Sequence, residues 1–208
     1  MTTSIVFDFG AVLFDWRPDL LVAEQFPDLA TSPQTSQALV REIFHHDDWQ
    51  SFDCGTVELD QVIARTASRL ALPQAGLATL MSGIGERLQP IPESLALLTR
   101  LRERRDQSGD IRLYFLSNMP VLFARVLERR HAFLRWFDGG VFSGDVRLIK
   151  PDPAIYALLE SRYALEPSRI VFMDDLLPNV AVARARGWRG IHFASAEQAG
   201  PLIFPVAA

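Results

Sequence analysis

The stretch Ile5-Val6-Phe7-Asp8-Phe9-Gly10-Ala11-Val12 decides the fold of this 208-residue chain. Its first three residues are β-branched or aromatic, and they predict a buried strand. The strand ends on a carboxylate, Asp8, and Gly10 then permits a sharp turn. Ligands of open α/β sheets bind outside the carboxyl ends of the strands, so we expect Asp8 to lie in a functional site.

A second apolar run, Ile170-Val171-Phe172-Met173, also ends on acids, Asp174 and Asp175. Carboxyl ends of parallel strands meet at one edge of a sheet, and hard cations such as Mg²⁺ take oxygen ligands. Together with Asp8, these acids therefore predict a site for one divalent cation. For any one of the acids alone, a turn or cap hydrogen bond is the simpler explanation.

The pattern of the remaining chain predicts an α/β fold. Residues 93–193 alternate between predicted helices and strands, which is typical of a parallel sheet with helices on both faces. Residues 16–90 show helical spacing and are far more numerous than the dozen or so residues that a crossover needs. We predict a Rossmann-like core of residues 1–15 and 91–208, with an α-helical cap, residues 16–90, inserted after the first strand.

Details of the cap are also predicted from its sequence. Thr56 is a plausible N-cap for a helix over residues 57–70, and residues 73–87 form a weaker helix interrupted by glycines. The polar residues between 45 and 53 suit a loop that faces the substrate. We expect the two aromatic residues in this stretch, Trp49 and Phe52, to pack inside the cap.

Composition excludes several classes of function. A net charge of −4 and a pI near 5.6 give no reason to expect nucleic acid or an anionic membrane as partner. The only cysteine, Cys54, cannot form an internal disulfide. No secretory signal or uncharged run of about 20 apolar residues is present, so we expect a cytoplasmic protein. The sequence does not indicate an oligomeric state.

Lys150 is the only lysine among 21 basic residues. Arginine is thus accepted wherever a general positive charge suffices. A compact ammonium differs from a planar guanidinium in shape, hydration and reach. We therefore expect Lys150 to have a role that arginine cannot fill.

Four short motifs occur in order at the ends of the predicted core elements, and they are Phe7-Asp8-Phe9-Gly10, Leu116-Ser117-Asn118, Lys150-Pro151 and Phe172-Met173-Asp174-Asp175. This set resembles the haloacid dehalogenase superfamily, most of whose members are Mg²⁺-dependent phosphatases. Within it, the first motif is similar to that of the Asp-x-Gly-x-Val sugar-phosphate phosphatases. The resemblance covers the core from about residue 5 to residue 193.

The resemblance implies a role for each of these residues. Asp8 would be the nucleophile that forms an aspartyl-phosphate, and Lys150 would neutralise it. Mg²⁺ would be held by Asp8, the carbonyl of Gly10 and Asp175. The remaining roles follow the same pattern: Ser117 and Asn118 would bind the phosphoryl oxygens, and Asp174 and Asn179 would orient the metal site from behind.

The sequence departs from the superfamily at one catalytic position. Most phosphatases of this superfamily carry a second aspartate two residues after the nucleophile, as general acid and base, and here that position is Gly10. Easily departing leaving groups, or a proton donor elsewhere, would be needed. The cap residues His45, His46, Asp47, Asp48 and Asp53 are candidates for that donor.

We expect a Mg²⁺-dependent phosphatase of a small phosphorylated metabolite, which the resemblance implies to be a sugar phosphate. One alternative is a metal-free 2-haloacid dehalogenase, in which Asp8 attacks carbon and expels a halide that needs no proton. The pair Asp174-Asp175 weighs against it, because adjacent carboxylates repel without a cation. A non-catalytic binding protein on the same fold is the second alternative.

Overall fold

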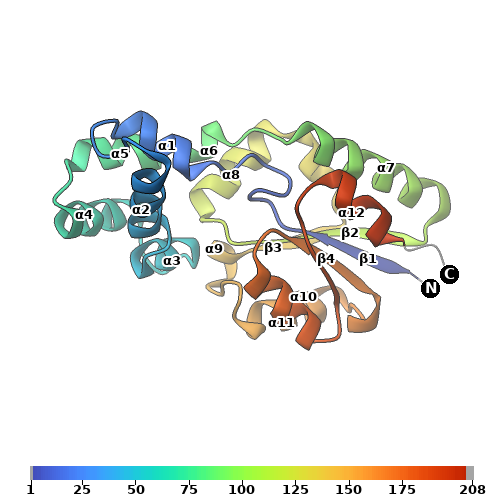
Figure 1. Cartoon of the computed structure of the whole chain (residues 1–208). Helices are drawn as coiled ribbons and strands as arrows, with labels where there is room; N and C mark the ends of the chain where they lie inside the picture. Colours follow the sequence, from blue (N-terminus) through green and yellow to red (C-terminus); the bar gives the residue numbers. More distant parts are fainter. Residues whose placement is uncertain (1, 205–208) are drawn as a thin grey trace.

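A computed structural model describes residues 2–204, which form a five-stranded sheet with helices on both faces and a group of helices beyond one end (Figure 1). All strand pairs are parallel, in the order β3-β2-β1-β4-β5. The strands are β1 Thr3–Phe7, β2 Ile111–Ser117, β3 Gly139–Phe142, β4 Ile170–Asp174 and β5 Arg189–His192. The predicted α/β parallel-sheet fold is confirmed.

The central strand, β1, is buried because helices cover both faces of the sheet. Ile5 and Phe7 belong to the core on one face, and Val6 belongs to the core on the other. This explains the continuous apolar run, which is characteristic of parallel strands buried on both sides. The first face is covered by α7 Pro92–Ser108, α8 Val121–Arg130 and α12 Ala196–Ile203. The second is covered by α10 Pro153–Tyr163 and α11 Leu177–Ala185, and the short α9 spans Ser143–Val146.

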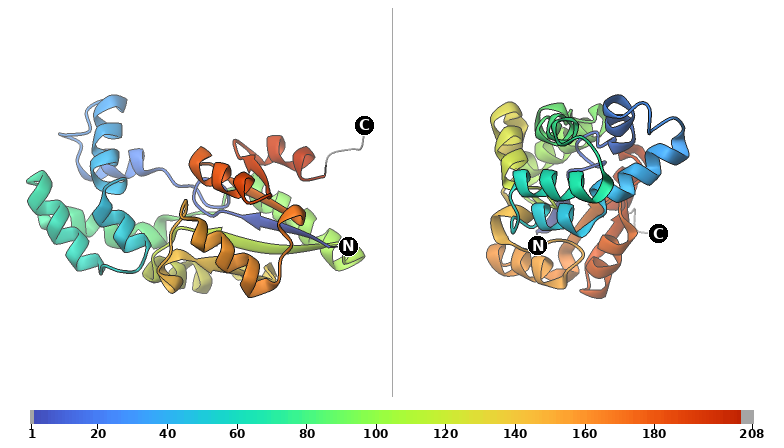
Figure 2. Two further views of the ribbon diagram at one scale, coloured as in Figure 1. Left: turned by 90° about the horizontal axis from the view of Figure 1, so that it is seen from below. Right: turned by 90° about the vertical axis from the view of Figure 1, so that its left-hand side faces the viewer.

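The helices between β1 and α7 lie beyond one end of the sheet, as Figure 1 and the left view of Figure 2 show. We use the name cap for residues 16–90, the division proposed from the sequence. The cap contains α1 Pro18–Gln25, α2 Pro33–Phe44, α3 Asp47–Asp53, α4 Leu59–Leu70, α5 Gln74–Ser82 and α6 Ile84–Arg87. Its α6 packs against α8 of the core.

The chain enters and leaves the cap at one place. Phe14 and Pro90 form an antiparallel bridge. The Asp15 amide donates to the Gln89 carbonyl at 2.8 Å, and the Ile91 amide donates to the Leu13 carbonyl at 2.9 Å. The two connections between cap and core are therefore paired through their backbones.

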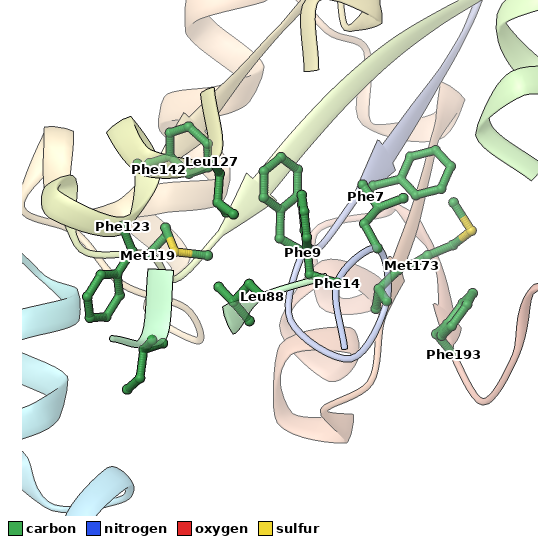
Figure 3. Packing of buried hydrophobic residues seen from close by; sticks show 14 of the residues in the cluster. Phe7, Phe9, Phe14, Leu88, Met119, Phe123, Leu127, Phe142, Met173 and Phe193 are labelled. Atoms are coloured by element: carbon green, nitrogen blue, oxygen red, sulfur yellow. The ribbon is translucent and has the colours of Figure 1, made fainter. Parts of the chain in front are cut away.

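Aromatic packing joins the other side of the cap to the core. The rings of Trp49 and Phe52 lie 6.3 Å and 5.5 Å from that of Phe123 on α8. Figure 3 shows Phe123 and Met119 on the side of the core that faces the cap. Trp49 and Phe52 are both buried, which agrees with the packing role predicted for them.

Three details of the predicted cap are wrong. Residues 47–53 form the helix α3 rather than a loop, because the His46 imidazole caps the amide of Asp48 at 3.1 Å. Helix α4 has Glu58 as its N-cap, since the Thr56 hydroxyl instead donates to the Ser51 carbonyl at 3.0 Å. The predicted helix over 73–87 is divided at Gly83 into α5 and α6.

Within residues 2–204, each helix is too short or too polar to cross a bilayer.

Candidate active site

Asp8 lies at the start of a tight turn that follows β1. The Phe9 carbonyl accepts hydrogen bonds from the amides of Leu13 and Phe14, each at 2.8 Å, and so folds the chain back. Ala11 takes the left-handed conformation with φ 54°, whereas the φ of Gly10 is not positive. Gly10 therefore does not need to be glycine for conformational reasons, and the atoms nearest to a Cβ placed there belong to Trp16, the closest at 3.8 Å.

Lys150 joins two of the predicted motifs. Its Nζ lies 2.8 Å from Oδ1 of Asp8 and 2.7 Å from Oδ2 of Asp174. Burial alone would lower the pKa of the ammonium, but Asp174 and Asp8 outweigh it and raise that pKa. The only lysine of the chain is thus buried and charged between two carboxylates.

Asp174 is fully buried, and both of its carboxylate oxygens are occupied. Oδ1 accepts from the Leu176 amide at 2.8 Å and from Asn179 Nδ2 at 3.0 Å. Oδ2 accepts from Lys150 and from the same Asn179 nitrogen at 3.0 Å. With these donors in place, Asp174 is suited to holding Lys150 and the turn after β4 rather than to binding a ligand.

Asp8, Asp174 and Asp175 form a carboxylate cluster in which one oxygen of each lies within 4.8 Å of the others. The pKa of Asp8 is raised to about 7: burial is the largest cause, Asp174 and Asp175 act in the same direction, and Lys150 opposes them. Burial and Asp174 likewise raise the pKa of Asp175 to about 6. The cluster thus holds more negative charge than one lysine compensates, which is a donor set that fits a hard divalent cation.

The residues of the second motif occupy different positions around this cluster. Ser117 is buried, and within residues 2–204 its hydroxyl has no hydrogen-bond partner. The Asn118 side chain accepts from the Lys150 amide at 2.8 Å and donates to the Lys150 carbonyl at 2.9 Å. Asn118 therefore fixes the segment that carries the lysine, while the buried Ser117 hydroxyl has hydrogen-bonding capacity left.

A cavity of about 390 Å³ opens over the cluster, between core and cap. Asp8, Lys150 and Asp175 lie on its wall together with Gly10. Most of the remaining wall is apolar, and its larger side chains are Trp16, Phe44, Trp49, Ile84, Met119 and Phe123. The charged end and the apolar walls suit a small molecule with one anionic group.

The structure separates the cap residues that sequence analysis grouped together. His45 and Asp53 lie on the cavity wall. Asp48 instead pairs with Arg65 at 3.3 Å and with Arg69 at 4.0 Å, so it ties α3 to α4. Asp47 is exposed on α3. Two of the five candidate donors, His45 and Asp53, therefore line the cavity.

Sequence reasoning missed the apolar lining of the cavity. Phe44, Met119 and Phe123 are as buried as core residues, and helical spacing gives the same signal for both environments. Of these three, Met119 alone has a sequence position that indicates nearness to the site, because it directly follows the Ser117-Asn118 motif.

A family model described as haloacid dehalogenase-like hydrolase matches residues 5–187. Among curated proteins, a sesquiterpene phosphatase of Aspergillus oryzae is 27% identical over 189 residues, which cover 91% of this chain and 88% of that protein.

Solved structures show the same fold. A HAD family enzyme of Bacteroides thetaiotaomicron, in complex with magnesium and inorganic phosphate, has a TM-score of 0.70 at 16% identity over 94% of this chain and 96% of that one. An L-2-haloacid dehalogenase of Xanthobacter autotrophicus has a TM-score of 0.67 at 19% identity over 100% of this chain and 85% of that one. Since the family model spans most of the sequence and a parallel α/β sheet carries its four motifs, the chain belongs to the haloacid dehalogenase-like hydrolases.

Proposed function

We propose that this hydrolase is a Mg²⁺-dependent phosphatase that forms an aspartyl-phosphate on Asp8. The observation that carries the proposal is the contact of Lys150 with both Asp8 and Asp174, beside the third acid, Asp175. This arrangement holds the Asp8 carboxylate still and offsets its charge as a phosphate dianion approaches.

The donor set fits Mg²⁺. Asp8, Asp175 and the carbonyl of Gly10 would hold the ion, since Asp174 already has its hydrogen-bond donors. When bound, the ion would draw the phosphate dianion toward the anionic nucleophile and polarise the phosphoryl group.

The other residues of the site position the reacting groups. The buried Ser117 hydroxyl would donate to a phosphoryl oxygen, and the backbone at Asn118 would do the same. Asn118 holds the Lys150 segment through its side chain, and Asn179 holds Asp174. Each of the four motifs then supplies one part of the chemistry.

The substrate that best fits the cavity is a monophosphate ester with an apolar organic group. A sugar offers several hydroxyl groups that require partners, whereas beyond the catalytic residues only His45 and Asp53 provide ionisable side chains on this wall. The similarity to a sesquiterpene phosphatase supports an apolar group as well. The lining thus favours a terpenyl or similar phosphate over the sugar phosphate that the first motif implies.

The dehalogenase alternative shares the fold and the nucleophile but is less compatible with the acids. A metal-free site would leave Asp8, Asp174 and Asp175 within 4.8 Å of one another with one lysine as counter-charge. Membership of a hydrolase family also makes a purely binding function the weakest of the three hypotheses.

Phosphate release from a panel of monophosphates tests the proposal. The panel includes a sesquiterpenyl phosphate, a simple alkyl phosphate, p-nitrophenyl phosphate, glucose 1-phosphate and glucose 6-phosphate, each with Mg²⁺ and with EDTA. We expect Mg²⁺-dependent release, with the highest kcat/KM for the apolar esters, and loss of turnover by at least about 10⁴-fold in Asp8→Asn. Halide release from a 2-haloacid in EDTA, without phosphate release from any ester, would contradict it.

A further inference from the structure

The proposed phosphatase lacks a proton donor where related enzymes carry one, because Gly10 has no side chain. When the P–O bond of an alkyl ester breaks, the leaving oxygen takes the electron pair and becomes a strongly basic alkoxide. A positioned acid that protonates this oxygen typically contributes about 10²–10⁴-fold to the rate. A donor must therefore reach the cavity from another element.

Asp53 is placed to reach that oxygen. It is the last residue of α3, and it lies on the wall of the cavity whose floor carries Asp8 and Lys150. Its side chain is half-buried, and within residues 2–204 it belongs to no ion pair. In an in-line displacement at phosphorus, the leaving oxygen lies opposite the attacking oxygen of Asp8. A residue on the cap side of the cavity is therefore on the side of the leaving group.

The backbone of Asp53 is fastened to the core. Its carbonyl accepts a hydrogen bond from the hydroxyl of Ser143 at the start of α9, and the same hydroxyl accepts from the Met119 amide at 2.8 Å. Two residues further on, Gly55 lies so close to Gly144 that an added Cβ would come within 2.5 Å of its carbonyl oxygen. These contacts tie the end of α3 to the loop that carries Ser117 and Asn118, so the carboxyl is held in register with the phosphate site.

The other candidates are placed less well. Asp48 is paired with Arg65 and Arg69, and Asp47 is exposed. His45 reaches the cavity wall but is an exposed residue at the end of α2. Asp53 is the one carboxyl of the cap segment that is both half-buried and on the cavity wall.

The surroundings of Asp53 favour its protonated form at neutral pH. Its pKa is raised to about 8, with burial as the largest cause and the charge of Asp8 acting in the same direction. A hydrogen bond from the Trp49 side chain, one turn earlier on α3, and the charge of Lys150 act in the opposite direction. The neighbouring Cys54 thiol is itself kept neutral, because burial and Asp53 raise its pKa.

We propose that Asp53 is the general acid and base of this enzyme, a catalytic role transferred from the core to the cap. In the first step, an Asp8 oxygen bonds to phosphorus, the ester P–O bond breaks, and the Asp53 proton passes to the leaving oxygen, which departs as the alcohol. In the second step, the Asp53 carboxylate takes a proton from water, whose oxygen displaces Asp8 from phosphorus. Phosphate leaves, and both aspartates return to their starting states.

The test separates the two steps with Asp53→Asn and two esters, and it rests on the proposed phosphatase activity. Rapid-mixing kinetics follow the first turnover of p-nitrophenyl phosphate, whose leaving group needs no proton, and of a simple alkyl phosphate. Asp47→Asn, on the exposed side of the same helix, is the matched control. His45→Gln tests the other ionisable residue that the cap contributes to the wall.

We expect Asp53→Asn to retain the rapid first release of p-nitrophenolate within about threefold of wild type, and then to turn over slowly as a phosphorylated enzyme that intact-mass measurement detects. Its first turnover of the alkyl ester should fall by at least about 10²-fold. The size of the p-nitrophenolate burst counts the folded sites, so misfolding is recognised separately.

A second variant tests whether an aspartate at position 10 can replace Asp53 as the proton donor. Because the backbone at Gly10 accepts a side chain without a left-handed φ or a close contact, Gly10→Asp in the Asp53→Asn background should recover at least about tenfold of the lost alkyl rate. Equal losses for both esters in Asp53→Asn, or an unchanged alkyl rate, would overturn the assignment. If the wild type hydrolyses neither ester, the proposed phosphatase function fails instead.

Discussion

At the scale of single residues, Lys150 shows how composition and geometry support each other. The sequence singles it out as the only lysine, and the structure places its ammonium between Asp8 and Asp174 with almost no exposed surface. Two contacts of 2.7–2.8 Å to opposed carboxylates suit a compact group with freely rotating protons.

We therefore predict that Lys150→Arg loses on the order of 10²-fold in kcat, because the planar fork cannot make both contacts in the same space. Steady-state kinetics with p-nitrophenyl phosphate measure the loss, and circular dichroism checks the fold. The matched control is Arg147→Lys, an exposed residue three positions earlier, which should keep full activity. Full activity of Lys150→Arg would show that arginine can replace the lysine at this position.

The sequence predicts that the motif residues lie close together, but it does not predict which of the candidate donors in the cap lies at the cavity. Asp8, Lys150, Asp174 and Asp175 follow strands or core loops, and the parallel sheet gathers such positions at one edge. His46 is the N-cap of α3, Asp48 lies in its first turn and Asp53 is its last residue, so position in the helix decides which of them reaches the cavity. That depends on where the helix begins, and a histidine cap is a weak signal in sequence.

At the scale of elements, the junction between α3 and α9 determines how the cap meets the core. Gly55 has a φ of +70°, and the space for its Cβ is filled by the carbonyl of Gly144. The positive φ and the close contact with Gly144 both act at Gly55, two residues after Asp53. At this junction the backbone of Gly55 packs directly against the backbone of Gly144. A side chain added at Gly55 would therefore meet backbone atoms, which cannot move aside as a flexible side chain can.

We predict that Gly55→Ala destabilises the protein by more than Gly109→Ala does. Gly109 has a similar φ of +66°, but nothing lies within 4 Å of its Cβ position, so its substitution reports backbone strain alone, about 1–2 kcal/mol. Urea unfolding of both variants measures the difference. Gly55→Ala should also lower kcat for alkyl esters, since the clash displaces the end of α3. Equal stability of the two variants would show that the junction has room to relax.

At the scale of the whole molecule, the buried acids predict how stability depends on pH. The pKa of Asp53 is about 8 in the folded protein, against an ordinary value of 3.8. Between these values the native state holds a proton that the unfolded chain has lost, so the contribution of this group to stability falls as pH rises through that window. Below pH 3.8 the contribution is fully present.

An asparagine in place of Asp53 cannot titrate, so Asp53→Asn should lose less stability than wild type between pH 5 and pH 8. Urea unfolding at several pH values measures this without reference to activity. The control Asp47→Asn should follow the wild-type curve, because that carboxyl is exposed. Parallel curves for wild type and Asp53→Asn would show that the Asp53 carboxyl is ionised in the folded protein.

The paired crossing of the chain between Leu13 and Ile91 also bears on how the protein folds. The central pair, β1 with β2, joins Thr3 to Ile111, and the whole cap lies between them in the chain. Such distant pairs form slowly, because the entropy of the intervening loop is lost before the contact is gained. Once Phe14 meets Pro90, only the short pieces 3–14 and 90–111 remain to be closed. The length of the cap then affects the closure of the crossing itself, whereas the two pieces that bring β1 to β2 keep their lengths whatever the size of the cap.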